Sequence, residues 1–377
     1  MSIIVSPGKP AKIARDPAVW TAEFTDPAVL KAERERFGRR AWTMLGLTRD
    51  LAAHGDWIRA DLWGRSVFVQ RFHDKLAGFE NVCAHRFFPL RTEDKGNGPL
   101  RCGLHGWMYD AKGKVIGAPL CEELFGKKQG ALDRHLKSIE VDICGGLVFG
   151  RLPPEPGDET PRPSLADYLG PFHAPVEKIT GSFDPMGDIE RTVAANWKIC
   201  YHLTLEDYHI GIAHPGTFSA NGYLPPGVFR YFRGDPHSAM IVDKTRIYDE
   251  IFADFRESCA RDRMAKPSYI IMQIFPNLLL FMTWNGIAGV GLYTPTAPDT
   301  TFYRINYAQI LEPDVELFTA EVKEGIMKYS TTLAEEDQLS AERLQQTAHQ
   351  TWMEPMLGGQ EERIAWFDET YAKFMAG

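Results

Sequence analysis

The sequence of 377 residues contains few cysteines and no long uninterrupted apolar run. Its six cysteines are too few and too scattered to form a disulfide framework in a chain of this length, so we expect them to bind metal or to pack in a core. The longest apolar stretch, residues 269–282, is interrupted by Gln273 and Pro276. A membrane helix needs about twenty consecutive apolar residues, and the sequence therefore predicts no membrane span.

The sequence also lacks a secretion signal and a cluster of basic residues. Its first residues, MSIIVSPGKPAKIARD, contain no apolar segment followed by a small-residue cleavage site, and we expect a cytoplasmic location. The formal net charge is −8, which argues against a nucleic-acid partner because binding to phosphates requires clustered Lys and Arg. An acidic surface is still compatible with a basic redox partner.

Apolar residues make up 44% of the chain, which is enough to bury a large core, and the length allows two domains. Residues 1–41 are rich in helix formers and predict a helical segment that packs on the second domain. Short β runs separated by turn signals predict a small antiparallel β domain at residues 42–152. Seven prolines in residues 153–175 mark the boundary. Residues 153–377 predict an antiparallel sheet covered by helices, including one helical stretch at residues 197–213, and the fold class is α+β.

Two loops of the predicted β domain each offer one thiolate and one imidazole. The four residues are Cys83 and His85 in the first loop, and Cys102 and His105 in the second. Thiolates with imidazoles suit either zinc or an iron–sulfur cluster, so the ligand types alone leave both open. Zinc fingers normally end in paired histidines on a helix, whereas these ligands alternate among strands. Gly106 and Trp107 also favour a cluster, because glycine allows close backbone approach and an aromatic ring shields the site.

A second group of candidate ligands lies in the other half of the chain. His209 and His214 are five residues apart and point about 140° apart on an ideal helix, so they can share a metal only where the helix bends or ends, as Gly211 permits. Asp337 lies on the mainly apolar stripe of a later helix, where a carboxylate must be paired or bound to metal. Glu336 is the alternative for this role. Two histidines and a carboxylate are the ligand set of non-haem Fe(II) oxygenases.

Both halves together resemble the large (alpha) subunit of Rieske-type ring-hydroxylating oxygenases. The segments NVCAHRFFPL and LRCGLHGWMYDAKGKV resemble its Rieske domain, without the extra cysteine pair of respiratory Rieske proteins. His209, His214 and Asp337 match the iron-binding positions of its catalytic domain. The resemblance implies a [2Fe-2S] cluster on the four Cys and His ligands of the first domain and a mononuclear Fe(II) on the three later residues.

The resemblance also implies an electron path between the two centres. In the family, a carboxylate three residues before the first iron-binding histidine connects it to a cluster histidine of a neighbouring subunit in a trimer. Glu206 occupies this position and is expected to contact His105 of the neighbour, with Asp207 as the competing candidate. The Glu-x-Tyr-His form resembles the branch that acts on carnitine-like and betaine-like quaternary amines. Where the family usually has Glu-Asn, this chain has Tyr201-His202, and we interpret His202 as a packed structural histidine.

The implied activity is that of a terminal oxygenase. The sequence has no nicotinamide or flavin fingerprint, so electrons should come from a separate NAD(P)H-dependent reductase, with or without a ferredoxin. We expect a homotrimer that uses O2 to hydroxylate or dihydroxylate a small, preferably aromatic, substrate; oxidation of a quaternary amine with C–N cleavage is the alternative. A Rieske electron carrier and a zinc-stabilised binding protein are the alternatives from other classes. The aromatic candidates for lining a pocket are Phe229, Tyr231, Phe232, Phe252, Phe255, Tyr269 and Trp284.

Overall fold

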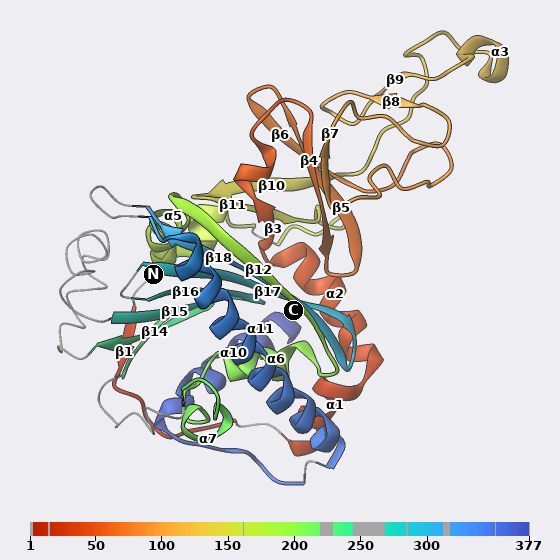
Figure 1. Cartoon of the computed structure of the whole chain (residues 1–377). Helices are drawn as coiled ribbons and strands as arrows, with labels where there is room; N and C mark the ends of the chain where they lie inside the picture. The colour runs from red at the N-terminus through yellow and green to blue at the C-terminus, as the bar shows by residue number, and fades with distance from the viewer. Residues whose placement is uncertain are drawn as a thin grey trace. The chain divides into compact units, whose positions relative to one another are not determined.

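The computed structural model describes most of the chain. The described residues are 3–13, 16–160, 162–218, 229–243, 268–283, 286–311, 317–350 and 352–376. The chain folds into two compact units (Figure 1): residues 37–165 form one, and residues 1–36 with 166–377 form the other. The domain boundaries expected from composition, after residue 41 and after residue 152, stay predictions.

The unit of residues 37–165 is built on a seven-stranded antiparallel sheet with the order β3-β11-β10-β6-β5-β4-β7. The strands are β3 (Thr43–Leu47), β4 (Asp56–Leu62), β5 (Arg65–Phe72), β6 (Lys75–Glu80), β7 (Lys95–Asn97), β10 (Ser138–Cys144) and β11 (Leu147–Arg151). A ribbon of β8 (Met108–Tyr109) and β9 (Val115–Gly117) and the short helices η1 (Thr48–Leu51) and α3 (Cys121–Phe125) complete it. The predicted small antiparallel β domain is confirmed.

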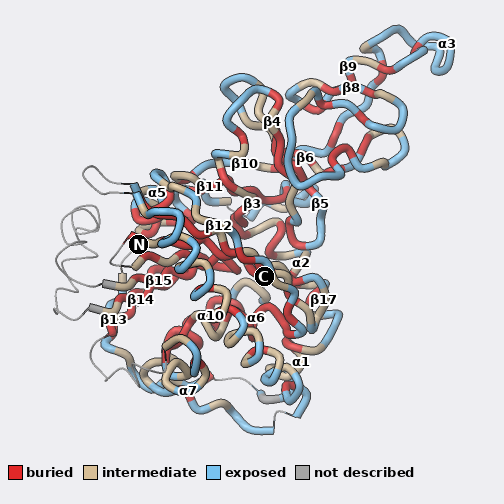
Figure 2. The backbone as a smooth tube through the Cα atoms, in the orientation of Figure 1, coloured by how far each residue is buried: buried red, intermediate tan, exposed pale blue. Residues whose placement is uncertain are grey.

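The other unit contains an eight-stranded antiparallel sheet with the order β1-β13-β14-β15-β16-β17-β18-β12. Its strands are β1 (Ile4–Ser6), β12 (Phe183–Val193), β13 (Phe229–Gly234), β14 (His237–Asp243), β15 (Ser268–Ile274), β16 (Leu278–Thr283), β17 (Ile287–Ala297) and β18 (Thr300–Ile310). A small pair of β2 (Ala11–Lys12) and β19 (Met356–Leu357) lies apart from it. Figure 2 shows that the strands of the large sheet are mostly buried, as expected for a sheet covered by helices.

The helices of this unit lie against the sheet and against each other. They are α1 (Pro17–Thr25), α2 (Pro27–Arg40), α4 (Leu165–Leu169), η2 (Gly170–Phe172), α5 (His173–Thr180), α6 (Trp197–Leu203), α7 (Ile210–Ala213), α10 (Ala320–Thr347), η4 (Ala348–Gln350), η5 (Gly359–Glu361) and α11 (Glu362–Ala376). Helix α10 contacts β12 and α6, while α6 contacts β17 and β18. The predicted α+β class is confirmed. None of the described helices combines the length and the apolar character that crossing a membrane requires.

One predicted helix is divided into two. The pattern of residues 197–213 predicted a single helical stretch, but α6 ends at Leu203 and α7 begins only at Ile210. Asn196 starts α6 by accepting a hydrogen bond from the backbone N–H of Lys198 at 3.0 Å. The two candidate ligands lie at the two ends of the short helix α7. His209 is at its N-terminal end and His214 at its C-terminal end.

A buried ion pair attaches the N-terminal helices to this unit. Glu33 of α2 is fully buried and forms an ion pair with Lys198 of α6. The same carboxylate accepts hydrogen bonds from Trp197 Nε1 at 2.9 Å and from the Tyr371 hydroxyl at 2.6 Å. A buried charge needs such partners, so Glu33 holds α2, α6 and α11 together and thereby supports the helix that precedes the His209 loop.

Acid should weaken this unit through His237, which is buried and held in its neutral form. Its Nδ1 accepts a hydrogen bond from the Phe275 backbone N–H at 3.0 Å, and its Nε2 donates to the Tyr168 carbonyl at 2.8 Å. Burial lowers the pKa of His237 to about 4. The unfolded chain binds this proton near pH 6.5, so the stabilisation is complete above that pH and decreases as the pH falls toward 4.

Between pH 7 and pH 5 we expect His237 to account for a loss of about 2 kcal/mol in the free energy of unfolding. Urea unfolding of the parent protein and of His237→Gln at both pH values measures this loss. The variant should be less stable at pH 7 but should show a smaller change with pH. An equal pH dependence in both proteins would remove His237 as the cause.

Candidate metal centres

The two loops that carry the first set of ligands have the same backbone hydrogen bonds. The N–H of Cys83 donates to the Phe88 carbonyl at 2.8 Å, and the N–H of Cys102 donates to the Trp107 carbonyl at 2.8 Å. Both cysteine carbonyls accept a bond from the residue four positions later, and these two residues, Phe87 and Gly106, have positive φ values of 62° and 74°. The repeated turn therefore presents one Cys and one His from each loop.

The four side chains of these loops meet at one end of the small unit. Cys83 and Cys102 are buried, and the ring centroids of His85 and His105 lie 4.8 Å apart. Trp107 stacks on His85 with centroids 4.6 Å apart, whereas His105 is exposed. Nδ1 of His85 is buried without a hydrogen-bond partner among the described residues, as expected for a metal ligand. The convergence of two thiols and two imidazoles fits a [2Fe-2S] cluster.

Tyr109 is a hydrogen-bond donor to this site that the sequence did not reveal. Its hydroxyl lies 3.0 Å from Cys83 Sγ and accepts a bond from the Ala84 N–H at 3.1 Å, so its own proton is available to the sulfur. Burial raises the pKa of the Cys83 thiol, and the hydrogen bond from Tyr109 acts in the opposite direction. The only sequence signal was the aromatic run after His105, which does not show where a hydroxyl points.

We expect Tyr109→Phe to lower the reduction potential of a cluster bound here by about 40 mV. A hydrogen bond to sulfur stabilises the reduced form, a typical bond contributes about 1 kcal/mol, and 59 mV corresponds to about 1.4 kcal/mol for one electron. Redox titration followed by visible absorption measures the shift. Unchanged iron and sulfide contents serve as the control, and an unchanged potential would mean that the hydroxyl does not donate to Cys83.

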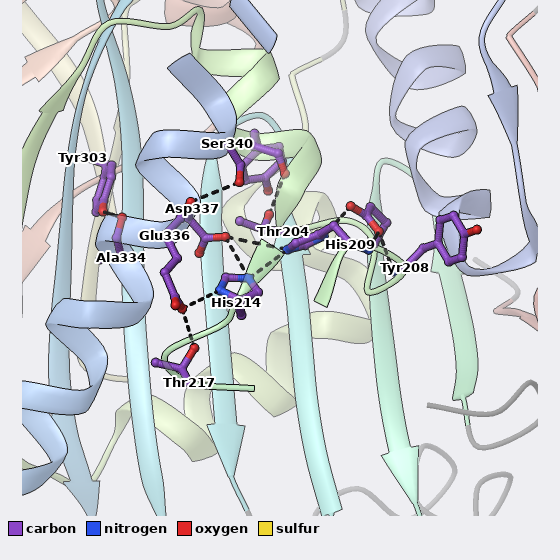
Figure 3. A network of polar contacts seen from close by, with 12 residues as sticks. Thr204, Tyr208, His209, His214, Thr217, Tyr303, Ala334, Glu336, Asp337 and Ser340 are labelled. Atoms are coloured by element: carbon purple, nitrogen blue, oxygen red, sulfur yellow. Dashed lines mark hydrogen bonds and ion pairs between the residues drawn. The ribbon is translucent and has the colours of Figure 1, made fainter. Parts of the chain in front are cut away.

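The second set of ligands also converges (Figure 3). Nε2 of His209 and Nε2 of His214 are 3.1 Å apart. Asp337 Oδ1 lies 3.7 Å from the former atom and 3.3 Å from the latter. These donor atoms all lie within 4.8 Å of one another, and the three residues are the one such group of His, Cys, Asp and Glu found among the described residues. Two imidazoles and a carboxylate arranged around one point fit a mononuclear Fe(II).

Each of the two histidines is oriented by its own glutamate. Glu206 binds Nδ1 of His209 and also accepts the backbone N–H groups of Tyr208 at 2.6 Å and of His209 at 3.1 Å. Glu336 Oε2 lies 3.0 Å from Nδ1 of His214. These contacts direct both Nε2 atoms toward Asp337, in the way that carboxylates orient metal-binding histidines.

In the structure, Glu336 contacts His214 and is not one of the three converging ligands. Glu336 was the alternative to Asp337 as a third ligand, but its carboxylate also accepts bonds from the Gly216 N–H and the Thr217 hydroxyl, both at 2.6 Å. It is therefore outside the group of three converging ligands. A histidine that binds metal usually shares its second ring nitrogen with a carboxylate or a carbonyl. The sequence therefore indicates that each candidate histidine needs such a partner, but it does not indicate which residue this is.

The charges at this site are arranged to hold a cation. Burial opposes a charge on His209, but Asp337 and Glu206 outweigh it and raise the pKa of His209 to about 10. Burial likewise disfavours the charged form of Asp337, yet hydrogen bonds with His209 and His214 keep the pKa of this carboxyl below its usual value.

Asp207 and Glu206 occupy different surroundings. Both are buried, but Glu206 binds the His209 ring, whereas one carboxylate oxygen of Asp207 has no hydrogen-bond partner among the described residues. Burial raises the pKa of Asp207 to about 7.

His202 packs edge-on against the rings of Phe24 and Phe367, at centroid distances of 6.1 and 5.4 Å, which is the packing expected of a structural histidine.

A cavity borders Asp337 and comprises ≈ 450 Å³ of space between atoms, including the part open to solvent. Tyr293 of β17 and Tyr303 and Tyr307 of β18 line it together with Leu203 and Asp337. The Asp337 side chain is 40% exposed because it faces this space. The aromatic candidates from the sequence are not among its lining residues, and Phe252, Phe255 and Trp284 lie outside the described residues. The only sequence signal was the spacing of four residues between Tyr303 and Tyr307 along one strand, which places both side chains on the same face of the sheet.

Comparison with known proteins covers both units. Residues 41–137 match the family described as "Rieske [2Fe-2S] domain", and residues 180–377 match "Ring hydroxylating alpha subunit (catalytic domain)". The glycine betaine monooxygenase oxygenase subunit of Chromohalobacter salexigens is 28% identical over 199 residues, which cover 51% of this chain and 42% of that protein. The N,N-dimethyl phenylurea N-demethylase subunit alpha of a Sphingobium strain is 31% identical over 206 residues, with coverages of 51% and 42%.

A solved structure extends the likeness of the fold to nearly the whole chain. The quaternary ammonium Rieske monooxygenase CntA, in complex with gamma-butyrobetaine, superposes with a TM-score of 0.74 at 19% identity and 94% coverage of both chains. The sequence matches to the curated relatives span less than two thirds of their length, about two fifths of each of the two proteins named above.

Proposed function

The chain belongs to the family of Rieske-type ring-hydroxylating oxygenase alpha subunits, and from this premise we propose that it is the terminal component of an oxygenase that oxidises an N-methyl group of a small organic substrate. A chain of this family binds a [2Fe-2S] cluster and a mononuclear iron. We assign the cluster to Cys83, His85, Cys102 and His105, and the iron to His209, His214 and Asp337. The observation that carries the proposal is the meeting of those last three side chains beside a cavity.

When bound, the cluster delivers single electrons and the iron activates O2. The chain itself would supply three ligand atoms, and one of the three residues, Asp337, also lines the cavity. Glu206 and Glu336 hold the two imidazoles by their Nδ1 atoms and so direct both Nε2 atoms toward the same point. The substrate is positioned by the walls of the cavity.

Electron transfer in this proposal runs between two copies of the chain. The exposed His105 would meet Glu206 of a neighbouring copy in a homotrimer, and Glu206 already binds His209. Phe87 and Leu104, next to the cluster ligands, are 81% and 49% exposed, and their burial against a second copy would stabilise such a contact. Inter-subunit electron transfer has been described for CntA. A separate NAD(P)H-dependent reductase, with or without a ferredoxin, would supply the electrons.

The relatives favour a nitrogen-bound methyl group over the aromatic ring that we expected first from the sequence. One of them is named for glycine betaine, a quaternary amine, and another for demethylation of an N,N-dimethyl phenylurea. The reaction would insert one oxygen atom into a methyl C–H bond, while two electrons and two protons convert the other atom to water. The hydroxymethyl product then loses formaldehyde and leaves the demethylated amine.

Metal analysis of the purified chain together with formaldehyde release tests this function. We expect about three irons and two acid-labile sulfides per chain. With a reductase and an N-methyl substrate, formaldehyde should appear in step with O2 consumption. Two irons and two sulfides with no mononuclear iron, after iron loss has been excluded, would favour an electron carrier. Colourless protein with one zinc and no sulfide would favour a zinc-stabilised binding protein.

A further inference from the structure

Most polar side chains of the cavity beside Asp337 already use their hydrogen bonds within the protein. Those that do so are Thr204, Gln338 and Tyr303. The Tyr303 hydroxyl, for example, donates to the Ala334 carbonyl of α10 at 3.4 Å. These groups hold α6 and α10 against the sheet, so they are not free to recognise a bound molecule.

Tyr293 differs from these residues. Its side chain lines the same cavity, yet its hydroxyl makes no hydrogen bond to any residue in the described part of the chain. Its position is well defined. The backbone N–H of Tyr293 donates to the Asn277 carbonyl at 3.1 Å, and its carbonyl accepts from Asn277 Nδ2 at 2.8 Å. Its ring packs on those of Tyr201 and Tyr303, with centroids 5.6 and 5.4 Å away.

The hydroxyl of Tyr293 is suited to donate rather than to carry a charge. Burial raises the pKa of this phenol well above its usual value, and the nearby Asp337 adds to the effect. The hydroxyl has no hydrogen-bond partner among the described residues, so its proton is available to an acceptor atom of a bound molecule. Tyr293 is thus a fixed and neutral donor in the cavity that Asp337 also lines.

The charge of the cavity wall limits which molecules can bind in the cavity. Asp337 is the single charged side chain among the described residues that line it. The described wall therefore offers no cation to pair with a carboxylate, and burying an unpaired carboxylate is strongly unfavourable. An uncharged molecule with apolar groups and one hydrogen-bond acceptor fits this wall better than a betaine, which carries both a quaternary nitrogen and a carboxylate.

We infer that Tyr293 determines substrate specificity by donating a hydrogen bond to a neutral acceptor, such as an amide carbonyl, of an uncharged N-methyl compound. This inference rests on the proposed function, which makes the cavity the substrate site. It narrows the range of substrates to uncharged N-methyl compounds and excludes a preference for zwitterionic quaternary amines.

Calorimetric binding without O2 tests the inference with three probes: N,N-dimethylbenzamide, N,N-dimethylaniline, which lacks the carbonyl, and glycine betaine. The benzamide should bind at least about ten-fold more tightly than the other two. Tyr293→Phe should weaken benzamide binding about five- to ten-fold and leave aniline binding within about two-fold. Tyr168→Phe is the matched control, because the Tyr168 hydroxyl donates to the Phe275 carbonyl at 2.7 Å and Tyr168 is not among the described residues that line the cavity, and it should change neither probe by more than about two-fold.

Three results would overturn the inference: tighter binding of glycine betaine than of the benzamide, equal losses for benzamide and aniline in Tyr293→Phe, or no binding of any probe at millimolar concentration. Iron and sulfide contents are measured on the same samples. A lack of either metal centre would refute the proposed function. The order of the probe affinities can be measured in protein with or without bound iron, and it tests only the role of Tyr293.

Discussion

Replacing Asp337 by alanine should remove the mononuclear iron and reduce substrate oxidation by more than about 100-fold, while the cluster stays in place. Asp337 provides the one oxygen that converges with the two imidazole nitrogens, at 3.3 and 3.7 Å. Without it, two neutral ligands remain, which is too few to retain Fe(II) against solvent. The iron content should fall from about three to about two per chain with an unchanged visible spectrum.

Glu335→Ala is the matched control for this prediction. Glu335 lies on the same helix two residues earlier, its side chain is 54% exposed, and it pairs with Arg191 at 3.4 Å. Because an exposed ion pair contributes little to stability, this variant should keep its iron and its activity. Retention of the mononuclear iron and of turnover in Asp337→Ala would show that the three side chains do not form the iron site.

Replacing Glu206 by glutamine should leave both metal centres loaded but slow the transfer of an electron to the iron site by about 100-fold. The carboxylate of Glu206 binds His209 Nδ1 with one oxygen and accepts two backbone N–H groups with the other. A glutamine amide has a single oxygen, so it cannot serve both sets of donors and it loses the charge that strengthens the contacts. The orientation of His209 and the proposed link to the neighbouring cluster would both suffer.

The rate of cluster reoxidation measures this effect directly. The protein is reduced with dithionite and mixed with O2 and substrate, and the cluster absorption is followed over time. Glu336→Gln is the comparison, since Glu336 orients His214 in a similar way but lies off the proposed path. Loaded with iron in the same way as Glu206→Gln, it should transfer electrons within about five-fold of the parent rate. A parent-like rate in Glu206→Gln would exclude Glu206 from the path.

Local patterns were sufficient to predict the fold class, which is confirmed, and to identify the candidate cluster ligands, whose role stays a prediction. Runs such as residues 66–72 and 301–311 are rich in β-branched and aromatic residues, and they form β5 and β18. The cluster ligands were identifiable because each loop holds its Cys and His two or three residues apart, and the same short turn presents both pairs. Short sequence separation makes such geometry nearly independent of the rest of the fold.

Contacts between distant segments decided the remaining features of the second centre. The division of the helix after Leu203 depends on the packing around the loop and not on propensity, so the pattern of residues 197–213 did not predict it. By contrast, Glu206, which the resemblance already favoured over Asp207, binds the ring of His209 only three residues later in the chain, so this contact is local.

The sequence by itself determined which chemical groups this protein has for binding metal and in which half of the chain each set lies. Only the tertiary structure decided that Glu336 orients His214 across 122 residues, and that Tyr293 faces the cavity with an unused hydroxyl. The physical reason is that side-chain direction around a helix or across a strand is set by the element's packing partners, and those partners come from remote parts of the chain.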